Sequence, residues 1–246
     1  MKIFFVSDSV VSIRNENGEK IGIKFDETNG FKDKILKLLK SAKKFVFICN
    51  ESQYIEDNES SAKVIFEELK KCGLPFEKYT VLDNRNKNNA REILKDADYV
   101  QLQGGIIAPQ LEYLKDIDFV DIMKDSGAVV LGKSAGAMNL QSNIYNYPET
   151  NEDIGLPKWL KGLGYSPYSI IPHFNLDTGN EYCFGDFHLL DDYYLPDSMG
   201  NVLYGIPNGS YIYLEDGIYT LYGEAYTIQD GVITKICDNE KSIIME

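Results

Sequence analysis

The chain has 246 residues, 43% of them hydrophobic and 26% charged, and this balance excludes an intrinsically disordered protein. Its net charge of −13 argues against nucleic acid as a partner, because binding to a polyanion needs a basic surface. No apolar run reaches the roughly 18 residues of a membrane span, and the apolar start is too short for a signal peptide, so we expect a cytoplasmic protein that does not contact a membrane.

Short apolar runs alternate with helical patterns through the first 145 residues. Apolar runs of strand length lie at 1–8, 44–49, 79–82, 99–102 and 128–131. Apolar residues at helical spacing predict helices over 31–42, 62–69, 91–97 and 111–123. Such alternation is typical of parallel strands joined by right-handed crossovers. We therefore predict an α/β fold with a mostly parallel central sheet flanked by helices.

The composition changes in the last third of the chain, where no lysine or arginine occurs from 162 to 234. Alternating apolar residues separated by Asp-Gly turns predict two β-hairpins there, over 210–222 and 224–236. We expect these hairpins to close the sheet at its C-terminal side.

The chain is expected to form a single domain, residues 1–246, because no linker or second apolar nucleus interrupts it. Polar stretches at 84–89 and 143–155 predict surface loops. The four cysteines are scattered with no CxxC pair, so reduced, buried thiols are expected rather than disulfides.

One segment predicts catalytic chemistry. An apolar strand runs straight into Gly132-Lys133-Ser134-Ala135-Gly136, and helix-forming residues follow. This is the pattern of a nucleophile elbow, a sharp turn that presents a serine hydroxyl above the carboxyl edge of a sheet. The N–H of Ala135, at the start of the helix, would stabilise an oxyanion. The alternative interpretation is a plain glycine-rich turn with a capping serine.

A serine nucleophile needs a base, and the chain has only two histidines. His173 follows an apolar run that ends at Pro172, which places it at the same sheet edge as the elbow. His188 is the weaker candidate, with packing or surface exposure as its simpler explanation. The turn Gly104-Gly105, at the end of another strand, offers a second set of backbone N–H groups, or is simply a tight turn.

These segments resemble peptidase family S51, which includes dipeptidase E and cyanophycinase and has a fold like that of class I glutamine amidotransferases. The matching residues are Gly-Lys-Ser-Ala-Gly-Ala at 132–137, Pro-His-Phe at 172–174 and Gly-Gly at 104–105 followed by Gln110. The segment 205–210, Gly-Ile-Pro-Asn-Gly-Ser, is also similar to a family segment.

The resemblance implies a serine hydrolase of small peptides that needs neither metal nor cofactor. Ser134 would be the nucleophile and His173 the general base, with the N–H groups of Ala135 and Gly105 as the oxyanion hole. It also implies an acidic residue between serine and histidine, for which the chain offers the following candidates: Glu149, Glu152 and Asp153. None of them aligns without a gap, and we choose Glu152.

Two departures from the family pattern bear on activity. The family's usual Gly-Gly-Gly-Asn turn is here Gly104-Gly105-Ile106-Ile107. Relatives that cleave after aspartate hold its carboxylate with basic side chains after the histidine, and this chain has no lysine or arginine from 162 to 234. An acidic substrate side chain would instead meet the following acids: Asp177, Glu181 and Asp186. Like charges repel, so strict Asp-X cleavage is expected to be absent.

The sequence therefore predicts a serine peptidase of dipeptidase type whose partner is a small peptide substrate. Two alternatives stay open: a non-catalytic binding protein on the same scaffold, and an enzyme that hydrolyses other amides or esters with the same serine and histidine. The sequence gives neither the substrate's identity nor the oligomeric state.

Overall fold

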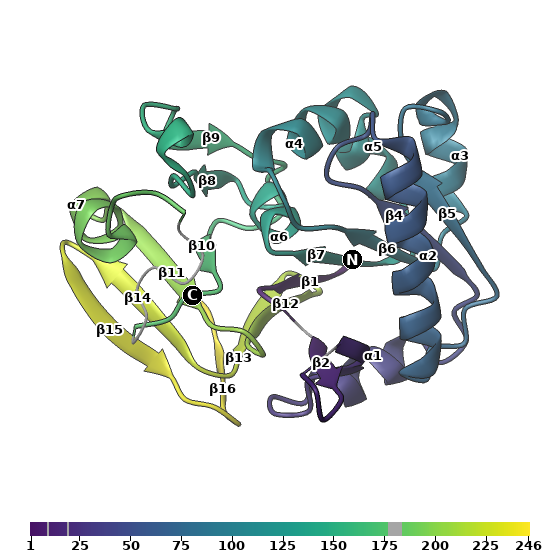
Figure 1. The fold of residues 1–246 in the computed structure, drawn as a ribbon, viewed down its shortest axis with the longest axis horizontal. Coiled ribbons are helices and arrows are strands. Elements are labelled where there is room, and N and C mark those ends of the chain that lie inside the picture. The colour runs from purple at the N-terminus through teal and green to yellow at the C-terminus, as the bar shows by residue number, and fades with distance from the viewer. Residues whose placement is uncertain (9, 19, 177–183) are drawn as a thin grey trace.

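The computed structural model describes residues 1–8, 10–18, 20–176 and 184–246. Its main sheet has eight strands in the order β16-β13-β12-β1-β7-β6-β4-β5 (Figure 1). Five neighbouring strands of this sheet are parallel, namely β1 (Lys2–Val6), β7 (Val129–Lys133), β6 (Tyr99–Leu102), β4 (Lys44–Ile48) and β5 (Lys78–Leu82). The mostly parallel α/β sheet predicted from the sequence is confirmed.

The parallel strands are apolar on both sides and are covered by helices on both faces (Figure 1). One face packs against α1 (Phe31–Leu38) and α2 (Ile55–Lys71), whose buried residues join the side chains of Phe4 and Phe47. The opposite face carries four helices: α3 (Ala90–Lys95), α4 (Ile107–Asp116), α5 (Phe119–Met123) and α6 (Ala135–Asn139).

Three antiparallel strands extend the main sheet beyond β1. They are β12 (Tyr211–Glu215), β13 (Ile218–Tyr222) and β16 (Ser242–Ile244). The two-residue turn between β12 and β13 has positive φ at both positions, 52° at Asp216 and 81° at Gly217. This is the turn geometry that joins twisted antiparallel strands, and the first predicted hairpin is confirmed.

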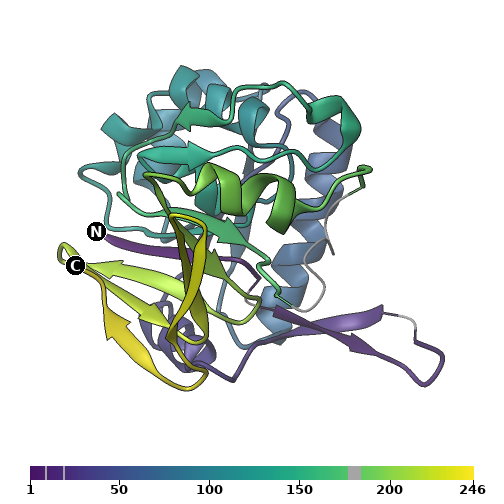
Figure 2. The same ribbon diagram turned by 90° about the vertical axis from the view of Figure 1, so that its left-hand side faces the viewer.

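A second sheet of four strands lies beside the main one (Figures 1 and 2). Its order is β10-β11-β14-β15, with β10 (Ser169–Pro172) parallel to β11 (Val202–Ile206) and the hairpin of β14 (Ala225–Gln229) and β15 (Val232–Cys237) completing it. The second predicted hairpin is therefore confirmed as a hairpin, but it belongs to a different sheet from the first.

Several elements differ from the sequence prediction. Helix α2 begins at Ile55, about two turns before its predicted start at residue 62. The single helix expected over 111–123 is two helices separated at Asp118, where φ is 55°. The hairpin of β2 (Val10–Arg14) and β3 (Lys20–Phe25), which projects from the body in Figure 2, was not predicted.

The surface loop expected at 143–155 is partly wrong. Residues Asn143–Tyr145 form β8, which pairs with β9 (Trp159–Lys161). Tyr145 is fully buried because its ring packs against neighbouring aromatic rings and its hydroxyl donates to Asp197 Oδ2 at 2.8 Å. The remaining short elements are η1 (Lys87–Asn89), η2 (Asn151–Asp153), η3 (Leu189–Tyr194) and α7 (Leu195–Asp197).

Across the described ranges, no helix has both the length and the apolar character to cross a bilayer. Cys49 and Cys237 are buried free thiols and Cys72 is a half-buried one, while Cys183 lies outside the described residues.

Candidate active site

Ser134 stands at the sharp turn between β7 and α6. Its backbone angles, φ 51° and ψ −118°, lie in a region that residues with side chains rarely adopt. The surroundings hold it there: the Ser134 N–H donates to Val6 O at 2.8 Å, and Ser134 O accepts from the N–H groups of Ala137 at 2.8 Å and Met138 at 3.0 Å. The predicted strand–turn–helix geometry around this serine is present.

Two glycines make the turn possible because strand and helix meet without space for a side chain. A Cβ on Gly132 would lie 2.6 Å from Gly136 O, and a Cβ on Gly136 would lie 2.4 Å from Leu102 O in the neighbouring strand β6. These separations are below any real carbon–oxygen contact. The elbow therefore requires glycine at both positions.

His173 lies within hydrogen-bond distance of the serine. Its Nε2 is 2.9 Å from Ser134 Oγ, although 39 positions separate the two residues in the chain. It follows directly after β10 in the second sheet and has a positive φ of 58°, so the ring turns back toward the carboxyl edge of the main sheet. His188, by contrast, precedes η3, where its N–H donates to Asp192 Oδ2 at 2.7 Å.

The other ring nitrogen of His173 faces an amide. Nδ1 is 2.7 Å from Asn208 Oδ1. An amide oxygen only accepts hydrogen bonds, so Nδ1 carries the proton and Nε2 keeps its lone pair. Nε2 can then accept the hydroxyl proton of Ser134, which is the tautomer that a general base needs.

The turn that carries Asn208 connects the two sheets, running from β11 to β12. The N–H of Gly209 donates to Asp8 O at 2.9 Å, just after the end of β1, and the hydroxyl of Ser7 donates to Ile206 O at 2.5 Å. Beside it, Phe174 packs onto Gly205, where any side chain would collide with the ring at 2.5 Å. These contacts account for the spacing of glycines around Asn208.

Burial lowers the pKa of His173 below its ordinary value. The hydrogen bond to Asn208 and the charge of Asp8 oppose this effect, and the charge of Lys133 adds to it. The imidazole is therefore predominantly neutral at pH 7, as a proton acceptor must be.

The predicted oxyanion residues also lie at this turn. A Cβ on Gly104 would come 3.0 Å from Ser134 Cβ, so the glycine turn that contains Gly105 rests against the serine. Gly105 has φ 136° and lies under the side chain of Asn50, whose Nδ2 donates to Ile106 O at 2.7 Å. Ala135 is the first residue of α6, where a backbone N–H has no acceptor within the helix.

The choice of Glu152 as the third residue is not supported by the geometry. Glu152 is exposed in η2 and forms no hydrogen bond to His173, and the position at Nδ1 is taken by Asn208. Asp153 is also engaged within its own segment instead of with His173, because its Oδ2 accepts from the N–H groups of Thr150 at 2.8 Å and Glu149 at 3.1 Å. This local cap keeps the three candidate acids, Glu149, Glu152 and Asp153, in the turn around η2.

Asn208 was missed as a partner of His173. It lies after the histidine instead of between serine and histidine, and it is neutral where an acid was expected. Its only sequence signal was its place in the segment 205–210, which resembles a family segment. Of the acids expected to repel an acidic substrate, Asp177 and Glu181 lie outside the described residues, and Asp186 Oδ2 accepts from Asn151 Nδ2 at 3.0 Å.

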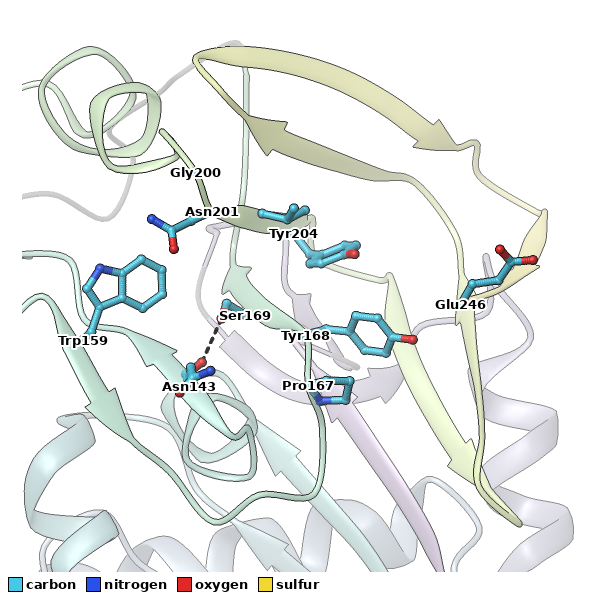
Figure 3. A pocket seen from close by; sticks show the side chains of 10 residues that line it. Asn143, Trp159, Pro167, Tyr168, Ser169, Gly200, Asn201, Tyr204 and Glu246 are labelled. Atoms are coloured by element: carbon cyan, nitrogen blue, oxygen red, sulfur yellow. Dashed lines mark hydrogen bonds between the residues drawn. The ribbon is translucent and has the colours of Figure 1, made fainter.

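Two pockets lie near these elements. One of about 350 Å³ reaches Lys133 and Gln103, the residues directly before Ser134 and Gly104. Another of about 560 Å³, shown in Figure 3, lies between Trp159 and Tyr204 at the start of β10, whereas His173 follows the end of that strand. In the part of the chain that is described, no three His, Cys, Asp or Glu side chains gather closely enough to hold a metal ion.

Comparison with known proteins supports the resemblance seen in the sequence. The chain's fold is similar to that of a protein of Listeria monocytogenes EGD-e that carries the provisional name peptidase E, with a TM-score of 0.55 and 15% sequence identity over 96% of this chain and 98% of that one. No curated protein gives a significant match. The model of peptidase family S51 matches residues 22–222. The chain therefore belongs to peptidase family S51 and is, by family, a peptide hydrolase.

Proposed function

We propose that this chain is a serine peptidase that hydrolyses small peptides, with Ser134 as nucleophile and His173 as general base. The observation that carries the proposal is the 2.9 Å separation between His173 Nε2 and Ser134 Oγ at a strained strand-to-helix turn. Such a pair is the minimum that nucleophilic catalysis by serine requires. The name of the similar Listeria protein, peptidase E, is consistent with peptides as substrates.

The reaction begins when Ser134 Oγ attacks the peptide carbonyl carbon and His173 Nε2 takes the hydroxyl proton. The carbonyl oxygen becomes an oxyanion, which the N–H groups of Ala135 and Gly105 stabilise. His173 then gives its proton to the leaving amine, and the acyl group stays on Ser134. Water attacks this ester with His173 again as base, and the acid product leaves. Each oxyanion donor of this kind contributes on the order of 10²–10³-fold to the rate.

Asn208 completes the arrangement as a positioning residue. Its oxygen fixes the orientation and tautomer of His173, as the amide does in cysteine peptidases of Cys-His-Asn type. A neutral amide gives less stabilisation to the imidazolium than a carboxylate would. We propose accordingly that the base works at lower pH than in a Ser-His-acid triad.

The charge pattern limits the substrates. No lysine or arginine occurs between 162 and 234, a range that includes the histidine and the 61 residues after it, so we propose that strict cleavage after aspartate is absent. Action inside the cytoplasm, where short peptides arise from protein turnover, is part of the same proposal.

The test is turnover of a dipeptide library by the purified chain, with Ser134→Ala as the matched inactive variant. We expect release of free amino acids from neutral dipeptides by the parent chain, and none above background from Ser134→Ala. Hydrolysis of simple esters and amides without any dipeptide cleavage would replace the peptidase proposal with the broader hydrolase. Equal activity of parent and variant would overturn the role of Ser134.

A further inference from the structure

The pocket of about 350 Å³ lies on the face of the main sheet covered by α2 and the β2–β3 hairpin. It reaches the sheet edge that carries Ser134, because Lys133 and Gln103 line it and directly precede Ser134 and Gly104. His173 approaches the serine from β10, whose residues pack with the opposite face. The pocket therefore lies on the sheet face opposite the one that β10 packs with, and two residues that line it, Asp8 and Lys133, are close enough for their charges to act on His173.

The walls of this pocket are apolar. The β2–β3 hairpin contributes Val10, Ile23 and Phe25, and helix α2 contributes Ile65 and Leu69. An apolar side chain that enters such a pocket gains free energy in proportion to the area it removes from water. The exposed residues Ser60, Ser61 and Val64 form its outer rim.

The floor is a directional chain of hydrogen bonds. The hydroxyl of Tyr99 donates to Gln101 Oε1 at 3.1 Å, and Gln101 Nε2 donates to Gln103 Oε1 at 3.3 Å. The side-chain oxygens of Gln101 and Gln103 therefore each accept a hydrogen bond from the residue before them in this chain of hydrogen bonds. None of the residues that the structure describes accepts a hydrogen bond from Gln103 Nε2, so this amide has N–H groups left for a carbonyl-type oxygen of a ligand.

The charges at the pocket cancel. Lys133 Nζ lies 2.9 Å from Asp8 Oδ2, and both side chains are about three-quarters buried, with 25% and 27% exposure. An additional charged side chain would lose its hydration in the pocket and meet an ion pair that is already matched. An uncharged side chain incurs no such penalty.

We propose that this pocket is the specificity pocket of the enzyme and that it takes an uncharged side chain flanking the scissile bond. The apolar walls fit the body of leucine or methionine, and the amide floor also fits glutamine, whose side-chain oxygen accepts from Gln103. Aspartate, glutamate and lysine are disfavoured by charge. The inference rests on the proposed function and adds a substrate class to it.

The test uses the ion pair to change the preference. Asp8→Asn leaves Lys133 without its counter-charge, so the pocket becomes positive and acidic side chains are favoured. Two dipeptide series, X-Ala and Ala-X, are compared with X as Leu, Met, Gln, Glu or Lys. The readout is the ratio of kcat/KM for Glu to that for Leu, because effects on Ser134 and His173 cancel in a ratio. Asp116→Asn, which removes a paired surface carboxylate far from the pocket, is the control.

In one of the two series, the parent chain and Asp116→Asn are expected to have kcat/KM values for Leu, Met and Gln at least tenfold above the value for Glu. In Asp8→Asn, the ratio of kcat/KM for Glu to that for Leu is expected to rise by about tenfold. The same ratio in Asp8→Asn and Asp116→Asn, or no preference in either series, would overturn the proposal. Calorimetric binding of the same peptides to Ser134→Ala separates this failure from that of the proposed function, because binding preference does not require turnover.

Discussion

Asn208 decides which nitrogen of His173 carries the proton, and it does so without a charge. With an amide at 2.7 Å from Nδ1, the protonated imidazole gains little electrostatic stabilisation, while burial opposes its formation. The pKa of His173 is accordingly lowered, and the neutral ring persists to more acidic pH than for a free histidine. Activity that needs the neutral base should fall only when the pH drops through this lowered pKa.

Asn208→Asp should move the acid limb of the pH profile upward. A carboxylate at Nδ1 stabilises the imidazolium and raises the pKa of His173, so the neutral base is lost at a higher pH, by about one pH unit or more. The measurement is kcat/KM for one neutral dipeptide between pH 4 and 9. Asn201→Asp makes the same change just before β11, at the opposite end of that strand from Asn208, and should leave the acid limb of the pH profile unchanged. An acid limb at the same pH in both variants would contradict the positioning role of Asn208.

At this scale the sequence predicted some contacts and missed others. Ser134 and His173 each end a strand-like apolar run, and the carboxyl ends of strands gather at one edge, so their proximity followed from pattern. Asn208 has no such signal. It stands in a turn between the two sheets, and its place depends on Gly209 and Ser7, whose bonds to β1 and β11 no local pattern contains.

The elbow depends on the absence of side chains at its two glycines. Strand β7 and helix α6 meet so closely that Gly136 packs on the backbone of Leu102, with no side chain between them. The strained φ of Ser134 is kept by this packing and by its bond to Val6 O. The helix that starts at Ala135 is only five residues long, so packing rather than helix propensity stabilises it.

Gly136→Ala should therefore be destabilising. The new Cβ would lie 2.4 Å from Leu102 O, and the forced separation of helix and strand should cost about 1–3 kcal/mol of unfolding free energy. Urea denaturation gives this value. Gly127→Ala is the matched control, because a Cβ there meets nothing within 4 Å and φ is not positive. Equal stability of the two variants would contradict the close packing described for the elbow.

The elements that the sequence missed share a physical cause. Helix α2 begins with polar residues such as Glu56 and Asp57. Its first turns therefore have no apolar residues at helical spacing, and the hydrophobic periodicity did not predict them. Strand β2 is exposed over most of its length and gives no alternation of buried and exposed residues. The break between α4 and α5 depends on the left-handed conformation of Asp118, which apolar spacing does not report.

At the scale of the whole molecule, the candidate site is a junction between two sheets. Ser134 ends β7 of the main sheet, while His173 and Asn208 follow β10 and β11 of the second one. The hydroxyl of Ser7 bridges the sheets, because it follows β1 and donates to Ile206 O at the end of β11. The distance between serine and histidine thus depends on how the sheets are held together.

Ser7→Ala should affect the rate as well as stability. Loss of this buried hydrogen bond should cost about 1–2 kcal/mol and loosen the placement of His173, lowering kcat about tenfold. Ser169→Ala removes a comparable bond, from Oγ to Asn143 O at 2.9 Å, at the opposite end of β10. Both variants should lose stability by urea denaturation, but only Ser7→Ala should lose rate. Equal kcat in the two variants would contradict the junction's role.

The main sheet was predictable because apolar strands alternate with helices over 145 residues. The second sheet was not, since β10 and β11 are parallel neighbours with a long connection between them, and their register depends on contacts across the molecule. Both hairpins were found from their Asp-Gly turns, yet nothing local assigns β12–β13 to one sheet and β14–β15 to the other.

The role of Ser134 is tested most directly by its reaction with a fluorophosphonate probe, followed by the intact mass of the chain and the site of the adduct. We predict a single adduct on Ser134, absent in Ser134→Ala and slowed by about 10² or more in His173→Ala, because the hydroxyl then has no base. Circular dichroism of both variants verifies that they are folded. Labelling of Ser134→Ala at the rate of the parent chain would contradict the account.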